Sequence, residues 1–208
     1  MNVFFKPWVG PDYAKSDRKI LVIGDSHYCG SCDRCGVRGN CSFEEMAECN
    51  NFTISTISDY IKFRAGGEKA NWMTKTYCRF DKLYYGKEEV SEEESVTLWN
   101  RIAFYNFLQT AASDDASNTN YTNDDYAASS PMATEVINEL RPDVVIVWGS
   151  RAWGAMTGEG WHDGANSYTG YYTLADGHVV HCIKIIHPSR IGLDEWIPKL
   201  DEFLKGLE

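Results

Sequence analysis

Residues 24–30 bring together side chains that could carry out chemistry, because they read Gly-Asp-Ser-His-Tyr-Cys-Gly. The carboxylate of Asp25, the hydroxyl of Ser26 and the imidazole of His27 are groups that act as acids, bases, nucleophiles or ligand contacts in enzymes. An apolar run at residues 19–23 precedes them and predicts a buried strand that ends at the first glycine. Open α/β sheets bind ligands beyond the carboxyl ends of their strands, so we expect this segment to line a site.

The next stretch of the chain is a Cys-rich insertion at residues 29–49. It holds five of the seven cysteines, namely Cys29, Cys32, Cys35, Cys41 and Cys49. Thiolates at this spacing suit a tetrahedral structural zinc ion, and the first three would also suit an iron–sulfur cluster. We expect zinc in preference to iron–sulfur, with redox-active or free thiols as the alternative. Cys78 and Cys182 look like ordinary buried residues.

The elements that must position these groups follow from hydrophobic periodicity. The clearest buried strand is residues 143–148, and residues 102–108 are apolar except for Asn106. A turn at Asp176-Gly177 predicts a hairpin whose second strand leads into His187. The expected strands are thus residues 19–23, 102–108, 143–148, 171–174 and 178–186.

Helices are expected between these strands, and the remaining stretches read as loops. The acidic run at 88–94 contains a capping box that starts one of the helices. The expected helices are residues 53–63, 72–83, the stretch that follows 88–94, 132–140, 150–156 and 193–207. Residues 1–18 predict an irregular arm, residues 111–131 a polar loop and residues 158–170 a further loop. The alternation predicts one domain, 1–208, folded as a three-layer α/β/α sandwich around a mostly parallel sheet.

Composition narrows the class of protein. The 208 residues are 43% apolar and 13% aromatic, which is enough to fill a core and excludes wholesale disorder. The net charge is −10, so any nucleic-acid role needs a local basic patch, for which Lys184, Arg151 and Arg190 are candidates. No apolar run is long enough for a membrane span, and no signal peptide is recognised. We expect a monomeric cytoplasmic protein without a membrane partner.

One interpretation of the first motif is a serine hydrolase. The strand followed by Gly-Asp-Ser resembles the opening of one hydrolase class, in which Ser26 would be the nucleophile. Those enzymes place an Asp three residues before the catalytic His, but Lys184 stands three residues before His187. Residues 149–152, Gly-Ser-Arg-Ala, also lack the Gly-x-Asn-Asp segment of that class. A serine without a base is an ordinary alcohol, so this is the third choice.

Several segments, in order, are similar to the uracil-DNA glycosylase superfamily. Residues 143–152 resemble its strand-Leu-Trp-Gly-x-x-Ala segment, and His187-Pro-Ser189 resembles its late His-Pro-Ser motif. Residues 24–30 occupy the place of its Gly-Gln-Asp-Pro-Tyr-His-Gly loop, and residues 51–54, Asn-Phe-Thr-Ile, are similar to its Cys-Phe-Ser-Val. The resemblance thus spans most of the chain from residue 19 to about 191, but only as short motifs. Residues 99–106 also resemble a little-described bacterial branch with a Gly-Glu-Ser-His-Tyr loop.

The resemblance implies a pocket for a flipped base. Phe52 would stack on the base, Asn106 would pair with it, and Tyr28 would exclude a C5 methyl. Asp25 would stabilise the sugar cation or orient water, and His187 would hydrogen-bond the departing base, with no metal required for the chemistry. Further substrate contacts are expected from the neighbours in these motifs, namely Ser26, His27, Ser189, Arg190 and Ile191.

This chain also departs from the family pattern. Ser26 fills the position of the water-activating Asp, and Asp25 lies one residue earlier, where the iron–sulfur members carry Glu. His27 replaces a Pro. The usual Pro-Leu becomes Arg190-Ile191, so Ile191 would be the wedge that enters the base stack. We expect hydrolysis of the N-glycosidic bond of uracil or another modified base, in DNA or in a free nucleoside. The alternative is an inactive module that binds a base, nucleotide or nucleic acid.

Overall fold

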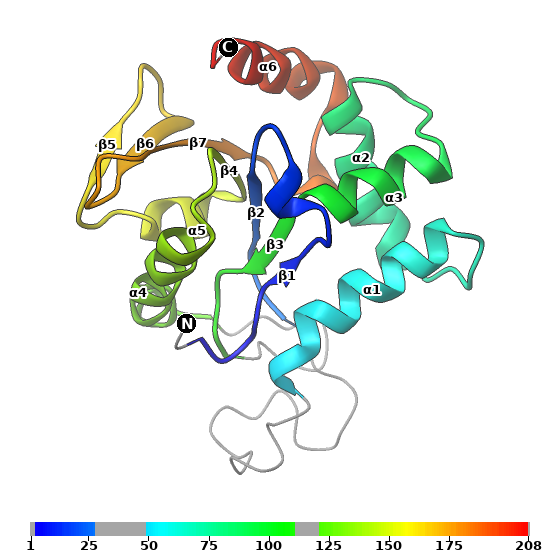
Figure 1. Ribbon diagram of the computed structural model, residues 1–208, viewed down its shortest axis with the longest axis horizontal. Coiled ribbons are helices and arrows are strands. Elements are labelled where there is room, and N and C mark those ends of the chain that lie inside the picture. The colour runs from blue at the N-terminus through cyan, green and yellow to red at the C-terminus, as the bar shows by residue number, and fades with distance from the viewer. Residues whose placement is uncertain (1–2, 28–48, 111–120, 208) are drawn as a thin grey trace.

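The computed structural model describes residues 3–27, 49–110 and 121–207. In these residues seven strands form one sheet in the order β1-β3-β2-β4-β7-β6-β5 (Figure 1). The strands are β1 (Trp8–Val9), β2 (Ile20–Gly24), β3 (Ala103–Asn106), β4 (Val144–Trp148), β5 (Trp161–Asp163), β6 (Thr169–Thr173) and β7 (Val179–Ile185). The central strands β3, β2, β4 and β7 are parallel, while β1, β6 and β5 are antiparallel to their neighbours. The sheet is therefore mixed, with a parallel centre.

Helices cover both faces of the sheet, so the fold is α/β with three layers (Figure 1). The helices are α1 (Phe52–Arg64), α2 (Cys78–Tyr85), α3 (Glu92–Arg101), α4 (Asn123–Leu140), α5 (Ser150–Ala155) and α6 (Leu193–Lys205). A π-helical turn, Met73–Tyr77, runs directly into α2. Helices α4 and α5 pack on one face of the sheet, and the other four pack on the opposite face.

Strand β2 shows why this sequence needs two helical layers. Ile20 and Val22 belong to the core under α1, α2, α3 and α6, whereas Leu21 and Ile23 belong to the core under α4 and α5. Side chains alternate across a strand, and here both sets are apolar and buried. The predicted double burial of this strand is confirmed. The expected strand at 143–148, the hairpin and the capping box at Ser91 are confirmed as well.

Three loop predictions are wrong in part. Within 111–131, helix α4 already begins at Asn123, because Thr122 and Asp125 form a capping box that satisfies its first amides. Within 158–170, the short strand β5 pairs with β6. The arm at 1–18 contains β1, which adds an antiparallel edge to β3, and a 3₁₀ turn at Tyr13–Lys15.

Helix α2 carries a buried carboxylate, Asp81, on the side that faces the core. Asp81 is 1% exposed and accepts hydrogen bonds from the Tyr60 hydroxyl at 2.6 Å, the Trp99 indole N–H at 2.8 Å and the Ser95 hydroxyl. These donors come from α1 and α3, so Asp81 connects three helices. Burial raises the pKa of Asp81, and the three hydrogen bonds oppose that shift.

None of the helices in the described ranges has the length and apolar character that a membrane crossing requires.

Candidate functional site

The parallel centre of the sheet gathers four predicted segments at one edge. Gly24 at the end of β2 pairs with Asn106 at the end of β3, and β4 and β7 run in the same direction. Asp25 therefore follows β2, Arg151 follows β4 on α5, and His187 follows β7. The carboxyl ends of the parallel strands thus bring these segments to one end of the sheet.

Asp25 is the half-buried acid of this edge. The Tyr126 hydroxyl, near the start of α4, donates to its Oδ1 at 2.8 Å, and Ser26 provides a further side-chain hydrogen bond. Burial raises the pKa of Asp25, while these hydrogen bonds and the charges of Arg151 and Arg190 oppose the shift. Burial thus favours the protonated form of Asp25, and the two nearby guanidinium groups favour the ionised form.

His187 is held as a neutral imidazole. Its Nδ1 accepts the backbone N–H of Ser189 at 3.3 Å and lies 2.8 Å from the Ser189 hydroxyl. An Nδ1 that accepts from an N–H carries no proton, so the proton of the neutral ring is on Nε2. Burial and the nearby Arg190 lower the pKa of His187 to about 4. The edge of the ring contacts Trp148 with a centroid distance of 5.8 Å. His187 can therefore donate a hydrogen bond at neutral pH without carrying charge.

The turn that carries His187 is fixed from α2. The Arg79 guanidinium donates to the carbonyl oxygens of Pro188, at 3.0 Å, and Ile191. Ser189 and Arg190 are exposed, as a substrate contact requires. Ile191 is 1% exposed and packs in the core, so the prediction that it forms a wedge is wrong. An apolar side chain three residues after the His-Pro pair can pack inward as readily as outward, and here it completes the core.

His27 and Asn106 form a buried pair rather than an open contact surface. His27 is 2% exposed, its Nδ1 accepts from Asn106 Nδ2 at 3.3 Å, and its Nε2 faces Thr53 Oγ1 at 3.1 Å. Burial lowers the pKa of His27 to about 3, so the ring is neutral. The prediction that His27 contacts substrate is wrong. Asn106 is 7% exposed, and half-buried Phe52 lies edge-on to His27 at 5.2 Å.

Gly24 makes this pair possible. A Cβ at Gly24 would lie 2.2 Å from Asn106 Oδ1 and 2.8 Å from the ring of Phe104. We expect Gly24→Ala to lower the free energy of unfolding by about 1–3 kcal/mol, as overpacking typically does. Gly154→Ala is the matched control, because nothing lies within 4 Å of the position that the new Cβ would take. Alanine also favours the helix that contains residue 154. Urea unfolding of both variants tests this, and equal stability would contradict it.

Some predicted residues lie outside the described ranges. These are Tyr28, Cys29, Cys32, Cys35 and Cys41, so the metal remains a prediction. Cys49 is described, is half-buried and begins a 3₁₀ turn before α1. Within the described residues, no three His, Cys, Asp or Glu side chains are grouped as metal ligands would be. Cys182 is buried, as predicted, whereas Cys78 is only half-buried, so that part of the prediction is wrong.

A groove adjoins Asp25 between α4 and α5. Its volume is about 560 Å³, and Tyr126 and Arg151 line it together with small residues of both helices. Tyr126 is hydrogen-bonded to both Asp25 and Arg151, so it connects the groove to the acid.

Two residues of this site were missed by sequence reasoning. Tyr126 was assigned to a polar loop, although the pair Thr122 and Asp125 is a capping-box signal that would have placed it on a helix. Arg79 gives no such signal, because its partners are carbonyl oxygens about 110 residues away.

No protein-family model matches the chain, and no curated protein matches its sequence.

Proposed function

We propose that the protein hydrolyses the N-glycosidic bond of uracil or another modified base, and that its fold is of the uracil-DNA glycosylase type. The observation that carries the proposal is the convergence of an acidic group and a neutral imidazole at one sheet edge. Asp25 follows β2 and His187 follows β7, and both are influenced by Arg190.

The two groups suit the two charges that develop when the bond breaks. The sugar becomes positive and the departing base becomes negative. The carboxylate of Asp25 stabilises the sugar or orients the attacking water, and His187 Nε2–H donates to the base. Because burial raises the pKa of Asp25 and lowers that of His187, activity should rise as pH increases through the Asp25 pKa, and both groups are correctly protonated above it.

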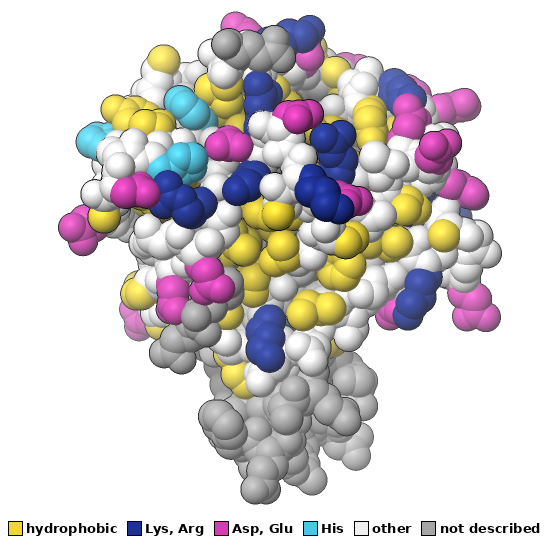
Figure 2. Space-filling view, viewed as in Figure 1, with side chains coloured by type: hydrophobic (Ala, Val, Ile, Leu, Met, Phe, Trp, Pro, Cys, Tyr) yellow, Lys and Arg dark blue, Asp and Glu magenta, His cyan; other side chains and the backbone are white. Residues whose placement is uncertain are grey.

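Substrate contacts would come from exposed groups around this pair. Arg151 and Arg190 are exposed and close enough to Asp25 to affect its pKa, so they can meet a phosphate beside the reacting sugar. Basic and acidic side chains are interspersed on the face shown in Figure 2, so a local pair of arginines is a more suitable contact than the whole surface. We assign Asn106 the role of holding His27 instead of reading a base, because its amide nitrogen contacts that ring.

The test is cleavage of labelled oligonucleotides, single- and double-stranded, that contain uracil, hypoxanthine or other modified bases. We expect alkali-labile abasic product from at least one substrate. Asp25→Asn should abolish most of this product. Asp59→Asn serves as its control, because Asp59 is an exposed carboxylate on α1 paired with Lys62. Absence of product on every substrate, with a protein shown to be folded, would contradict the proposal.

The same samples distinguish a binding module, which the buried His27–Asn106 pair favours. Saturable binding without product would indicate the module. If the ligand is a nucleic acid, the logarithm of the affinity should fall by roughly 0.7–0.9 per phosphate contacted for each tenfold rise in salt. Covalent labelling of Ser26 by a fluorophosphonate would instead support the serine hydrolase.

A further inference from the structure

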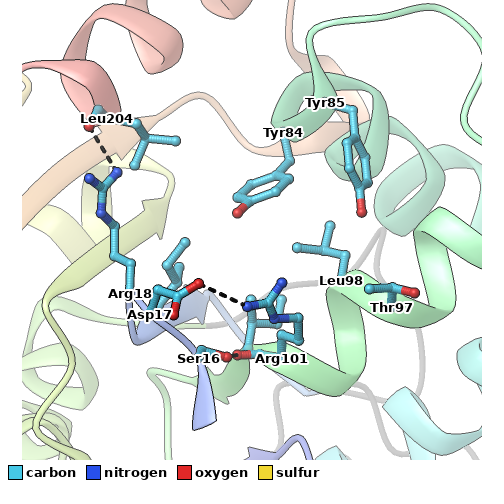
Figure 3. A pocket seen from close by; sticks show the side chains of 11 residues that line it. Ser16, Asp17, Arg18, Tyr84, Tyr85, Thr97, Leu98, Arg101 and Leu204 are labelled. Atoms are coloured by element: carbon cyan, nitrogen blue, oxygen red, sulfur yellow. Dashed lines mark hydrogen bonds and ion pairs between the residues drawn. The ribbon is translucent and has the colours of Figure 1, made fainter. Parts of the chain in front are cut away.

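A second cavity lies at the opposite end of β2 from Asp25. Its volume is about 430 Å³, and it is enclosed by the chain before β2, by α2 and α3, and by the last turn of α6 (Figure 3). The lining residues on which the argument rests are Asp17, Arg18, Ile20, Tyr84, Leu98 and Arg101. Its position separates it from the proposed glycosidic site.

Two arginines give this cavity a positive character. Arg18 Nη1 donates to the carbonyl oxygen of Leu204 at 2.8 Å, which occupies one of its five N–H groups. Arg101 Nη2 lies 3.5 Å from Asp17, whose side chain is fully exposed. Asp17 is the one acidic residue among the described residues that line the cavity. An exposed carboxylate at that distance neutralises a guanidinium weakly, so the cavity retains donors and net positive charge.

Tyr84 adds a third donor. Its hydroxyl points into the space between the two guanidinium groups (Figure 3) and has no hydrogen-bond partner within the described residues. Burial raises the pKa of Tyr84, and the charges of Arg101 and Arg18 oppose that shift without removing it. The phenol therefore stays protonated. Tyr85 differs, because its hydroxyl already donates to the carbonyl oxygen of Glu94 at 2.8 Å.

We propose that this cavity binds a small molecule through an oxyanion, in the first place a phosphate monoester. Guanidinium groups pair with phosphate or carboxylate through two parallel hydrogen bonds, and a protonated phenol can complete the cradle. The remainder of the ligand would lie on the apolar wall, which Ile20 and Leu98 provide. The positive charge of the cavity is local. An anionic ligand can therefore bind there although the protein as a whole has a net charge of −10. This inference is independent of the glycosidic reaction.

The experiment is calorimetric titration with inorganic phosphate, phenyl phosphate and benzoate. The variants are Arg18→Gln, Arg101→Gln and Tyr84→Phe, with Tyr85→Phe as the matched control, and thermal unfolding checks that each is folded. We expect phenyl phosphate to bind more tightly than inorganic phosphate. Each arginine variant should weaken binding roughly tenfold or more, and Tyr84→Phe roughly three- to tenfold. Tyr85→Phe should change affinity less than about twofold, since the hydroxyl it removes is already bonded.

Benzoate binding that is lost in the same variants would support the site and identify its oxyanion as a carboxylate. The absence of saturable binding by all three probes would overturn the proposal. Equal effects of Tyr84→Phe and Tyr85→Phe would also overturn it, because the cradle would then not depend on the hydroxyl that faces the arginines.

Discussion

Replacing Asp25 by asparagine is expected to reduce N-glycosidic cleavage roughly 100- to 10 000-fold, the range of a lost catalytic carboxylate. The amide keeps the shape of the side chain and can accept the Tyr126 hydroxyl, but it cannot become negative opposite the sugar cation. Burial already disfavours the ionised form of Asp25, so removing the charge should leave the melting temperature unchanged or higher. Initial rates and thermal unfolding of the same preparation measure the two effects.

Ser26→Ala is the matched variant for this experiment. It removes a hydrogen bond to the same carboxylate and leaves the charge in place. We expect a roughly three- to tenfold loss of rate, and an acidic limb of the pH profile that moves to higher pH, because one of the interactions that lower the Asp25 pKa is gone. If Ser26→Ala abolished cleavage and Asp25→Asn did not, the roles would be reversed and Asp25 would not be the principal group.

Asp81→Ala is expected to lower the free energy of unfolding by about 3–5 kcal/mol, because three buried donors lose their acceptor at about 1–3 kcal/mol each. The change leaves the donors of Tyr60, Ser95 and Trp99 without their acceptor inside the core. Asp81→Asn should cost less, since its amide oxygen can face the Trp99 N–H while the two hydroxyls accept from its nitrogen. Asp59→Ala, at an exposed carboxylate, should change stability by less than about 0.5 kcal/mol.

The pH dependence of this effect has a definite sign. The pKa of Asp81 is raised above 3.8, so folding favours its protonated form. The stability that this proton contributes is fully present below the unfolded pKa and is lost as pH rises through the folded pKa. The deficit of Asp81→Asn relative to the parent should therefore shrink as pH rises from about 4. Urea unfolding across that range measures it, and a deficit that grows with pH would refute the raised pKa.

The sheet centre could be predicted because its signals are local. Residues 20–24 and 144–148 are continuous apolar runs, and only a strand covered on both faces uses such a run fully. The hairpin could also be predicted, from the Asp-Gly pair at 176–177 that is typical of a turn. Gly177 indeed has a positive φ of 85°. Three-residue β5 was not readable, because a strand so short shows no periodicity and exists through its pairing with β6.

Sequence patterns predict which residues of the candidate site follow the parallel strands, but they do not predict which of those side chains face outward. Strand order brings Asp25 and His187 to one edge, and both residues could be identified from their motifs. Whether a side chain at that edge faces outward depends on tertiary contacts, which sequence spacing does not encode. The buried position of His27 follows from its contacts with Thr53 and Asn106, which lie 26 and 79 residues away along the chain. Ile191 is buried because it packs into a core that distant helices complete.

Strand β2 fixes the separation between the cavity lined by Arg18 and the groove next to Asp25. It is paired on both sides, with β3 and β4, and its side chains alternate between two cores. Arg18 and Asp25 flank it, and at about 3.3 Å per residue the seven steps between them span up to roughly 23 Å. A single inserted or deleted residue in β2 would exchange its two faces and displace at least one flanking group. Substitutions can thus tune either cavity alone, whereas a change of length would disturb the core and a ligand site together.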